Sequence, residues 1–187
     1  GNKLRIKESA DLIQILLGYK DIETTYSNLK SNSHFKLRVT HHDTKISNVL
    51  FDNQDKGICV IDLDTVMPGY FISDVGDMMR TYLCPVDEDE QDYVKIVIRP
   101  EMYQAIVKGY YEEMKNELTP TEKEYFFYAG KFMIYMQALR FLTDYLMDDV
   151  YYPVKHPRHN FVRAGNQITL LQKLVAQQKE LEEVLIS

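Results

Sequence analysis

The sequence is poor in cysteine, and this excludes several classes of protein. Its 187 residues include two cysteines, and Cys59 and Cys84 have neither the spacing of zinc ligands nor enough partners for a disulfide framework. Both lie among apolar neighbours, so we expect small core side chains and a reducing, cytoplasmic environment. Disulfide-rich and cysteine-zinc folds are therefore excluded.

Basic residues are also scarce. Lys and Arg number 22 against 28 Asp and Glu, which gives a formal net charge of −6, and no basic stripe is present. Such a chain offers little with which to neutralise a run of phosphates, so we expect no nucleic-acid partner. The acidic run at 87–92 is typical of a solvated loop or helix start, and we assign it no function.

Long apolar runs and internal repeats are missing as well. The most apolar segment, Tyr125–Met147, is interrupted by Lys131, Arg140 and Asp144, so it predicts a buried helix rather than a membrane span. No membrane partner is expected. The length and the hydrophobic fraction of 45% are typical of a single domain over residues 1–187.

Helical periodicity dominates what is present. Five stretches have the pattern or the start signals of a helix: 6–17, 22–29, 100–114, a segment from the capping box at 119–122 to about Met147, and 168–185. Between them, apolar runs at 48–51 and 58–63 flank turn-forming residues and predict a β-hairpin. The expected fold class is α+β, mostly α-helical, with this single hairpin.

Polar side chains gather where the chain enters the hairpin, in the segment THHDTKISNVLFD at 40–52. Asp43 and Asn48 lie close together around a tight loop, and Asp62 follows the second strand. Because a hairpin returns its ends to one place, we expect these three side chains to converge. Carboxylate and amide oxygens suit Mg²⁺; with Asn48 and Asp62 on the metal, Asp43 stays free to accept a hydroxyl proton. The set predicts phosphoryl transfer.

A histidine-based metal site is the weaker interpretation of the same chain. His41 and His42 are adjacent, so they point to opposite faces of an extended segment. His156 and His159 have helical spacing, but neighbouring prolines argue against a helix there. We interpret these histidines as loop residues.

The order and spacing of the cluster resemble a known family. His41-x-Asp43-x-x-x-x-Asn48 is similar to the catalytic loop shared by protein kinases and the aminoglycoside and choline kinases, and Asp62 stands where their metal-binding aspartate follows the hairpin. The segments HHDTKISNVLF, CVIDLDTVMPG and SDVGDMMR resemble, more closely, the N-acetylhexosamine 1-kinases of the phosphotransferase enzyme family. The resemblance implies a protein-kinase-like C-terminal lobe that binds ATP, Mg²⁺ and a sugar.

The resemblance also implies a role for each residue of the loop. Asp43 would be the catalytic base towards the anomeric hydroxyl of the sugar, and His41 would brace the loop. Lys45 would approach the transferring phosphate, where its charge offsets the charge that develops. Asn48 and Asp62 would hold Mg²⁺.

Further roles follow for residues outside the loop. Asp74 would be a buried aspartate that caps backbone N–H groups of the catalytic loop, and Asp64 would add either a metal contact or a hydrogen bond. Tyr82, Arg140 and Tyr151 lie in segments that resemble sugar-contacting regions. Aromatic rings and a guanidinium suit stacking on and hydrogen bonding to a pyranose.

Taken singly, each of these polar residues has an ordinary explanation. Loop Asp and Asn residues usually serve the local backbone, and a solvated lysine at Lys45 needs no function. The ordered set, and no single member, favours the functional interpretation. Asp77 and Arg80 are interpreted as helix-face or local ion-pair residues.

One part of a kinase of this superfamily is not visible in the sequence. The 42 residues before Asp43 contain no glycine-rich loop, strand lysine or helix glutamate of a nucleotide-binding N-terminal lobe. We therefore expect residues 1–187 alone to have little or no kinase activity, because such catalysis depends on positioning. Two alternatives stay open: a non-catalytic binding or regulatory module, or a kinase for another small alcohol such as choline, an aminoglycoside, homoserine or methylthioribose.

Overall fold

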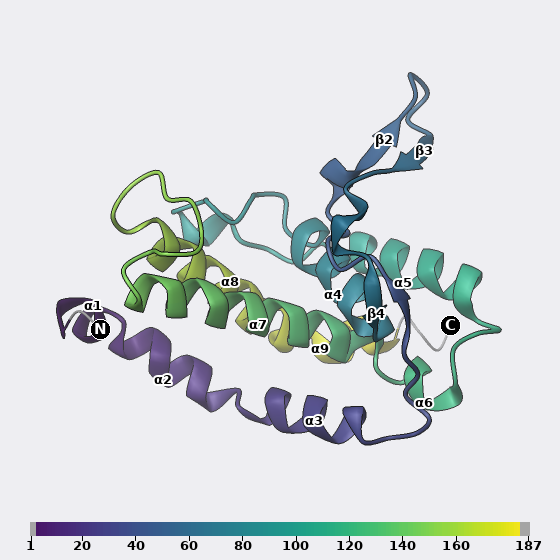
Figure 1. The fold of residues 1–187 in the computed structure, drawn as a ribbon, viewed down its shortest axis with the longest axis horizontal. Helices are drawn as coiled ribbons and strands as arrows, with labels where there is room; N and C mark the ends of the chain where they lie inside the picture. Colours follow the sequence, from purple (N-terminus) through teal and green to yellow (C-terminus); the bar gives the residue numbers. More distant parts are fainter. Residues whose placement is uncertain (1–2, 184–187) are drawn as a thin grey trace.

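The computed structural model describes residues 3–183 and shows a mostly helical body from which a small β part projects (Figure 1). The helices are α1 (Lys3–Glu8), α2 (Ala10–Gly18), α3 (Asp21–Lys30), α4 (Phe71–Tyr82), α5 (Pro100–Met114), α6 (Pro120–Lys123), α7 (Phe126–Leu146), α8 (His159–Ala176) and α9 (Gln178–Glu183). The strands are β1 (Arg38–Thr40), β2 (Val49–Phe51), β3 (Gly57–Val60) and β4 (Met67–Gly69). The expected mostly helical α+β class is confirmed.

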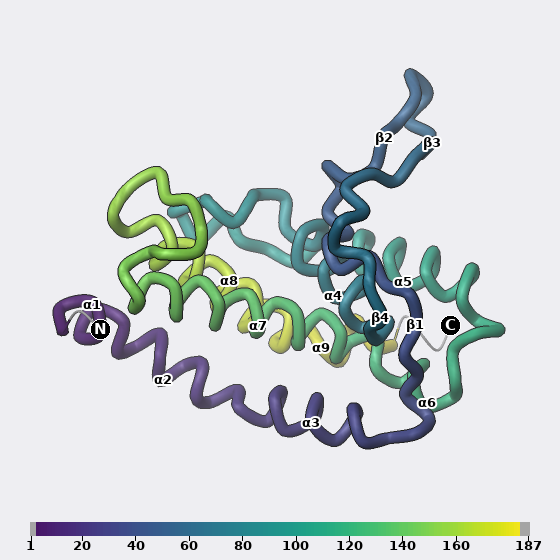
Figure 2. The backbone as a smooth tube through the Cα atoms, viewed as in Figure 1, coloured from purple at the N-terminus to yellow at the C-terminus, as the bar shows by residue number. Residues whose placement is uncertain are grey.

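Helix α7 forms the centre of the body because it is apolar on nearly every side. It packs against α4 and α8, and α3 also contacts it (Figure 2). Phe126, Ile134 and Ala138 are among its fully buried residues. At Gly76 of α4 an added Cβ would collide with the Ala129 carbonyl of α7, so this glycine permits the close approach of the two helices. That packing fixes the position of α4 beneath the β part.

The predicted hairpin is present and extends away from the helices (Figures 1 and 2). Strands β2 and β3 pair antiparallel, with Val49 opposite Val60 and an irregularity between Leu50 and Phe51. In the turn, the Asp52 carboxylate accepts hydrogen bonds from backbone N–H groups of residues 54 and 56. Such side-chain bonds are the reason why aspartate favours turns.

The expectation of a single hairpin is corrected by a second antiparallel pair, which joins β1 to β4. Arg38 lies opposite Gly69, and Thr40 lies opposite Met67. The sequence Met-Pro-Gly of β4 carries almost no strand signal, since Pro and Gly are depleted in strands. Because β1 precedes the predicted active-site loop and β4 precedes α4, the pairing of the two strands brings that loop close to the start of α4.

The long helix expected from Thr119 to Met147 is divided. The capping box is present, with mutual hydrogen bonds between Thr119 and Glu122, but it opens only α6, and α7 begins separately at Phe126. The buried Glu122 carboxylate also binds Arg38 at 2.5 Å. Glu122 therefore ties α6 to β1 rather than serving only as a local cap.

Three further expectations need correction. Helix α8 begins at His159 directly after the proline-rich segment, so His159 is helical while His156 lies in the preceding loop. The apolar stripe predicted for 168–185 spans α8 and α9, and its last member, Leu185, lies outside the described residues. Cys59 is exposed on the hairpin rather than buried, whereas Cys84 is buried as expected.

Among the helices of residues 3–183, none combines the length and the apolar character needed to cross a membrane.

Candidate active site

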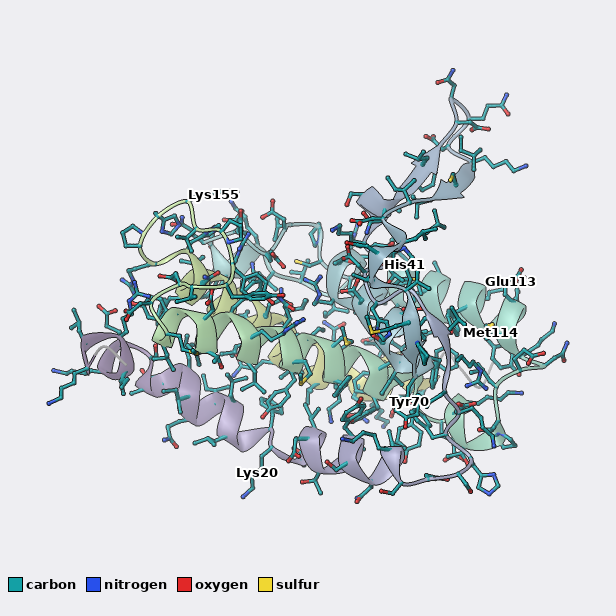
Figure 3. All side chains as sticks on the ribbon, viewed as in Figure 1. Lys20, His41, Tyr70, Glu113, Met114 and Lys155 are labelled. Carbon is teal, nitrogen blue, oxygen red and sulfur yellow. The ribbon has the colours of Figure 1, made fainter. Side chains whose placement is uncertain are left out.

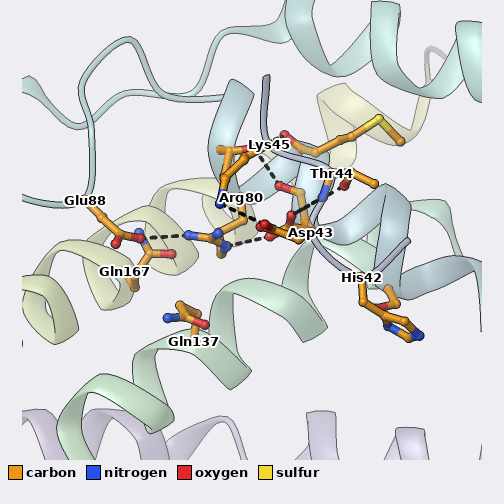
Figure 4. Close-up of polar contacts among 12 residues, drawn as sticks. His42, Asp43, Thr44, Lys45, Arg80, Glu88, Gln137 and Gln167 are labelled. Carbon is orange, nitrogen blue, oxygen red and sulfur yellow. Dashed lines mark hydrogen bonds and ion pairs between the residues drawn. The ribbon is translucent and has the colours of Figure 1, made fainter. Parts of the chain in front are cut away.

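Asp43 lies in the loop between β1 and the hairpin, and its two carboxylate oxygens have different surroundings (Figure 4). Oδ2 accepts hydrogen bonds from Lys45 Nζ at 2.8 Å and from Asn48 Nδ2 at 2.8 Å. No donor within the described residues binds Oδ1 at hydrogen-bond distance. The side chain is 25% exposed, so Oδ1 remains open to a ligand.

These contacts set the ionisation of the pair. Partial burial acts to raise the pKa of Asp43, but the hydrogen bonds from Lys45 and Asn48 outweigh it and hold the pKa below its usual value. The hydrogen bond to Asp43 raises the pKa of Lys45. At neutral pH the loop therefore presents a carboxylate and an ammonium in contact.

Helix α4 supports the loop through two carboxylates, Asp74 in its first turn and Asp77 near its middle. Asp74 accepts from the backbone N–H groups of His41, at 3.0 Å, and His42, at 2.8 Å. Asp77 accepts from the N–H of Thr44 at 2.8 Å. The hydrogen bonds expected of Asp74 are thus present, although Asp74 is half-buried and Asp77, 3% exposed, is the buried member.

The two histidines of the loop bind protein atoms rather than each other. The N–H of Asp43 donates to His41 Nδ1 at 3.3 Å, so His41 Nε2 is the atom that donates to the Ile61 carbonyl, at 3.1 Å. His41 thereby joins the loop to the end of β3, as a bracing residue would.

His42 is held in a left-handed conformation, with φ of 67°. Its ring nitrogens lie 2.6 Å from Ser73 Oγ and 2.7 Å from Thr40 Oγ1. A Cβ at Gly69 would collide with this ring and with Thr40, so only glycine fits beside it. Backbone strain of about 1–3 kcal/mol is typical of such positions at functional sites.

Asp62 and Asp64 form a second carboxylate group at the end of the hairpin. Their mutual hydrogen bond and charge repulsion raise the pKa of Asp62, while Lys45 acts to lower it. The charge of Asp43 also acts to raise this pKa. The convergence of Asp62 with Asp43 and Asn48 stays a prediction. Asp62 also has a left-handed backbone, with φ of 63°.

The metal set proposed from the sequence has a plausible donor chemistry. A cation between the carboxylates of Asp62 and Asp64 would offset their mutual repulsion, and Asn48 keeps its amide oxygen free because Nδ2 faces Asp43. Counting only His, Cys, Asp and Glu, no group of three or more within residues 3–183 could hold a metal ion. The set fits Mg²⁺ because that ion takes few protein ligands beside phosphate oxygens.

The sequence predicts only a helix-face or local ion-pair role for Arg80, whereas the structure places it at the cavity. Its guanidinium bridges Asp77 Oδ1 and Glu88 Oε2, each at 2.9 Å, and lines the cavity beside Asp43 (Figure 4). The predicted local ion pair with Asp77 is confirmed. A signal was available, because Asp74, Asp77 and Arg80 are spaced by three residues and share one face of α4.

A cavity of about 630 Å³ opens next to Asp43, a volume typical of small-molecule sites. Arg140 and Tyr151, both predicted to contact sugar, line it. Tyr82 does not line it: its hydroxyl donates to the Thr44 carbonyl, and burial followed by the charge of Asp77 raises its pKa to about 12. Tyr82 therefore supports the loop that carries Asp43 and lies outside the lining of this cavity, and its sugar contact stays a prediction.

The cavity wall that carries Tyr151 is fixed by a buried carboxylate of α7. Asp144 accepts from the N–H groups of Tyr151, at 2.8 Å, and Tyr152, at 2.9 Å. The amide of Asn160 in α8 donates to the same carboxylate at 2.9 Å. The loop between the two helices is thereby held at one side of the cavity.

The model of the phosphotransferase enzyme family matches residues 3–110, more than half of the 187 residues. The chain belongs to the phosphotransferase enzyme family. The match includes the catalytic loop, the hairpin and α4, the elements that hold Asp43, Asn48 and Asp62. Membership supports phosphotransfer of the kinase type, and kinases of the phosphotransferase enzyme family generally use ATP and Mg²⁺.

Proposed function

We propose that this chain is the kinase-like C-terminal lobe of an ATP-dependent sugar kinase, and that the acceptor is the anomeric hydroxyl of an N-acetylhexosamine. The observation that carries the proposal is the open Oδ1 of Asp43 at the edge of the cavity, with Lys45 and Asn48 bound to Oδ2. This arrangement leaves one oxygen for an acceptor hydroxyl and places a cation beside it.

In the proposed reaction, Asp43 orients the hydroxyl through Oδ1 and takes its proton as the new O–P bond forms and the bond to ADP breaks. The lowered pKa makes Asp43 a weak base, which suits a loose transition state in which little negative charge is needed on the nucleophile. If Lys45 turns to the transferring phosphate, Asp43 loses a hydrogen bond and becomes a stronger base at that moment.

Three oxygen donors would hold Mg²⁺: the amide oxygen of Asn48 and the carboxylates of Asp62 and Asp64. When bound, the ion neutralises charge on the phosphate oxygens of ATP. Asp64 is included because its carboxylate lies in hydrogen-bond contact with that of Asp62.

The charge of the cavity supports a neutral, hydroxyl-rich acceptor. Four acidic side chains line it, Asp43, Asp77, Asp87 and Glu88, against three basic ones, Lys45, Arg80 and Arg140. A polycationic aminoglycoside would call for a larger acidic excess, and the quaternary ammonium of choline would call for an aromatic cage. Within residues 3–183, the cavity lining holds two tyrosine rings and no Phe, those of Tyr151 and Tyr152, which meet edge to face.

The hairpin supports the proposal that a nucleotide-binding lobe completes the site. Figure 3 shows side chains of the hairpin extending away from the helical body. Several are large and apolar, including Ile58, 61% exposed, and Val60, 51% exposed. Apolar surface of this kind beside an active site is typical of a face that another body covers. We propose that the covering lobe delivers ATP to Asp43.

The test is an acceptor panel with Mg·ATP. Two proteins should be purified: residues 1–187, and the full product of the longest open reading frame that encodes them. Each should be incubated in parallel with N-acetylhexosamines, an aminoglycoside and choline. We expect the encoded protein to form an anomeric sugar phosphate, visible by phosphorus NMR, and residues 1–187 alone to form little. Phosphorylation of a non-sugar acceptor only would contradict the substrate, and absence of transfer to every acceptor would favour a non-catalytic binding module.

A further inference from the structure

We propose that Gln167 of α8 is a specificity-determining residue, whose Oε1 accepts a hydrogen bond from a hydroxyl of the acceptor. The proposal rests on the acceptor cavity of the proposed function. It is carried by a polar atom that the rest of the structure leaves without a partner.

The orientation of the Gln167 amide follows from a chain of hydrogen bonds. Asn166 Nδ2 donates to the backbone carbonyls of Asp87, at 3.0 Å, and Glu90, at 3.3 Å. A carbonyl can only accept, so the other end of the Asn166 amide must be its oxygen. That oxygen accepts from Gln167 Nε2 at 3.2 Å. The free end of the Gln167 amide is therefore an acceptor, Oε1, and not a donor.

This oxygen is buried and unpaired. Gln167 is 2% exposed, and its Oε1 is one of the few enclosed side-chain atoms in the described part of the chain that have no hydrogen-bond partner. Buried polar atoms are normally paired, so an exception calls for a ligand or a water molecule. Because Gln167 lines the cavity, a bound molecule can supply the missing donor.

The position of Gln167 suits recognition rather than chemistry. Figure 4 shows Arg80 between Gln167 and Asp43, and the ion pairs of Arg80 with Asp77 and Glu88 fix it there. If one hydroxyl of the acceptor binds Asp43, a group further along the same molecule would therefore reach Gln167. The terminal amide torsion is broad, so a small rotation turns Oε1 towards such a group.

The chemistry of Oε1 selects among acceptors. It gains a hydrogen bond from a sugar hydroxyl, and it gains nothing from a C–H at the same place. One unmade hydrogen bond to a buried acceptor costs about 10- to 100-fold in affinity. An acceptor that has a C–H in place of the hydroxyl facing Gln167 Oε1 should therefore bind more weakly.

The experiment compares sugar binding without nucleotide, by calorimetry or ligand-observed NMR, using N-acetylglucosamine and its 3-, 4- and 6-deoxy analogues. The unsubstituted chain should bind one of the three analogues about 10- to 100-fold more weakly than the parent sugar. Gln167→Met, which removes the oxygen at similar volume, should weaken the parent sugar by a similar factor and abolish the penalty for that analogue. Gln167→Glu, which retains an oxygen, should preserve the penalty.

Gln172→Met is the matched control, because Gln172 is an exposed residue of the same helix. A melting curve for each variant separates lost binding from lost folding. Unchanged ranking of the analogues in folded Gln167→Met, with sugar binding intact, would overturn the role of Gln167 alone. Failure of the unsubstituted chain to bind any of these sugars would overturn the sugar acceptor itself, and this role with it.

Discussion

Two requirements on the basicity of the Asp43 carboxylate oppose each other. Its pKa is lowered by Lys45 and Asn48, so it is ionised at neutral pH, yet a weak base is poorly suited to remove a proton early in a reaction. Phosphoryl transfer with a loose transition state relaxes that demand. In the proposed function, the open oxygen then serves chiefly to orient a hydroxyl, and the paired oxygen keeps the carboxylate in place.

Lys45→Met tests the electrostatic coupling between Lys45 and Asp43. Removing the ammonium takes away a hydrogen bond and a positive charge, so the pKa of Asp43 should rise towards its ordinary value. Because the proposed reaction needs the ionised carboxylate, the acid limb of the pH profile of kcat/KM should move to higher pH, and kcat should fall. Lys56→Met, at the exposed hairpin turn, provides the matched control. An acid limb at the same pH in both variants would contradict the Lys45–Asp43 coupling.

For single residues, the sequence predicts contacts within the loop motif well and tertiary contacts poorly. Asp43 and Asn48 could be named because they are neighbours in one loop, and their contact was confirmed at 2.8 Å. Tyr82 and Gln167 could not be assigned, since their partners lie in other elements. An aromatic or an amide in a helix gives no sign of which carbonyl or cavity it will meet.

Helix α4 acts as the scaffold of the catalytic loop. Three residues on one of its faces, Asp74, Asp77 and Arg80, bind backbone groups of the loop or line the cavity beside it. Close packing of α4 on α7 at Gly76 makes this support rigid. The precision of the site therefore depends on a helix that supplies none of the proposed reacting groups.

Asp77→Ala tests this support. The change removes the acceptor for the Thr44 N–H and leaves Arg80, already largely buried, with one carboxylate partner fewer. We expect a loss of about 2–4 kcal/mol in the free energy of unfolding, measured by urea denaturation, together with a lower kcat. Asp77→Asn retains an oxygen for the Thr44 N–H and should lose less of both. Full stability and activity in Asp77→Ala would show that the loop does not need this contact.

Elements with a strong local signal were predicted, and those that depend on pairing were not. The hairpin at 49–60 and the helix at 100–114 follow from apolar spacing and from turn or proline signals. Strand β4 exists because β1 lies beside it, and its residues have little strand propensity. The capping box at Thr119 was correctly identified but did not determine how far the helix continues.

The whole molecule brings segments that are distant in sequence to one cavity. The catalytic loop, α4, the 84–90 segment, α7 and α8 all contribute to its lining. Asp89 binds Lys155, His159 and Arg163, so the segment after α4 is tied to the start of α8. In the proposed function, the loop that carries Asp43 forms the reacting end of the cavity and Gln167 forms its recognition end.

Sugar phosphorylation by the proposed full-length kinase, measured with and without Asp43→Asn, directly tests whether Asp43 takes part in phosphoryl transfer. Asparagine preserves shape but cannot take a proton, so we predict a fall of about 100- to 10,000-fold in kcat with sugar affinity largely retained. Asp55→Asn, at a left-handed turn position that asparagine tolerates, should leave kcat unchanged. A kcat for Asp43→Asn equal to that of the unsubstituted protein would contradict the assignment of this loop as the site of phosphoryl transfer.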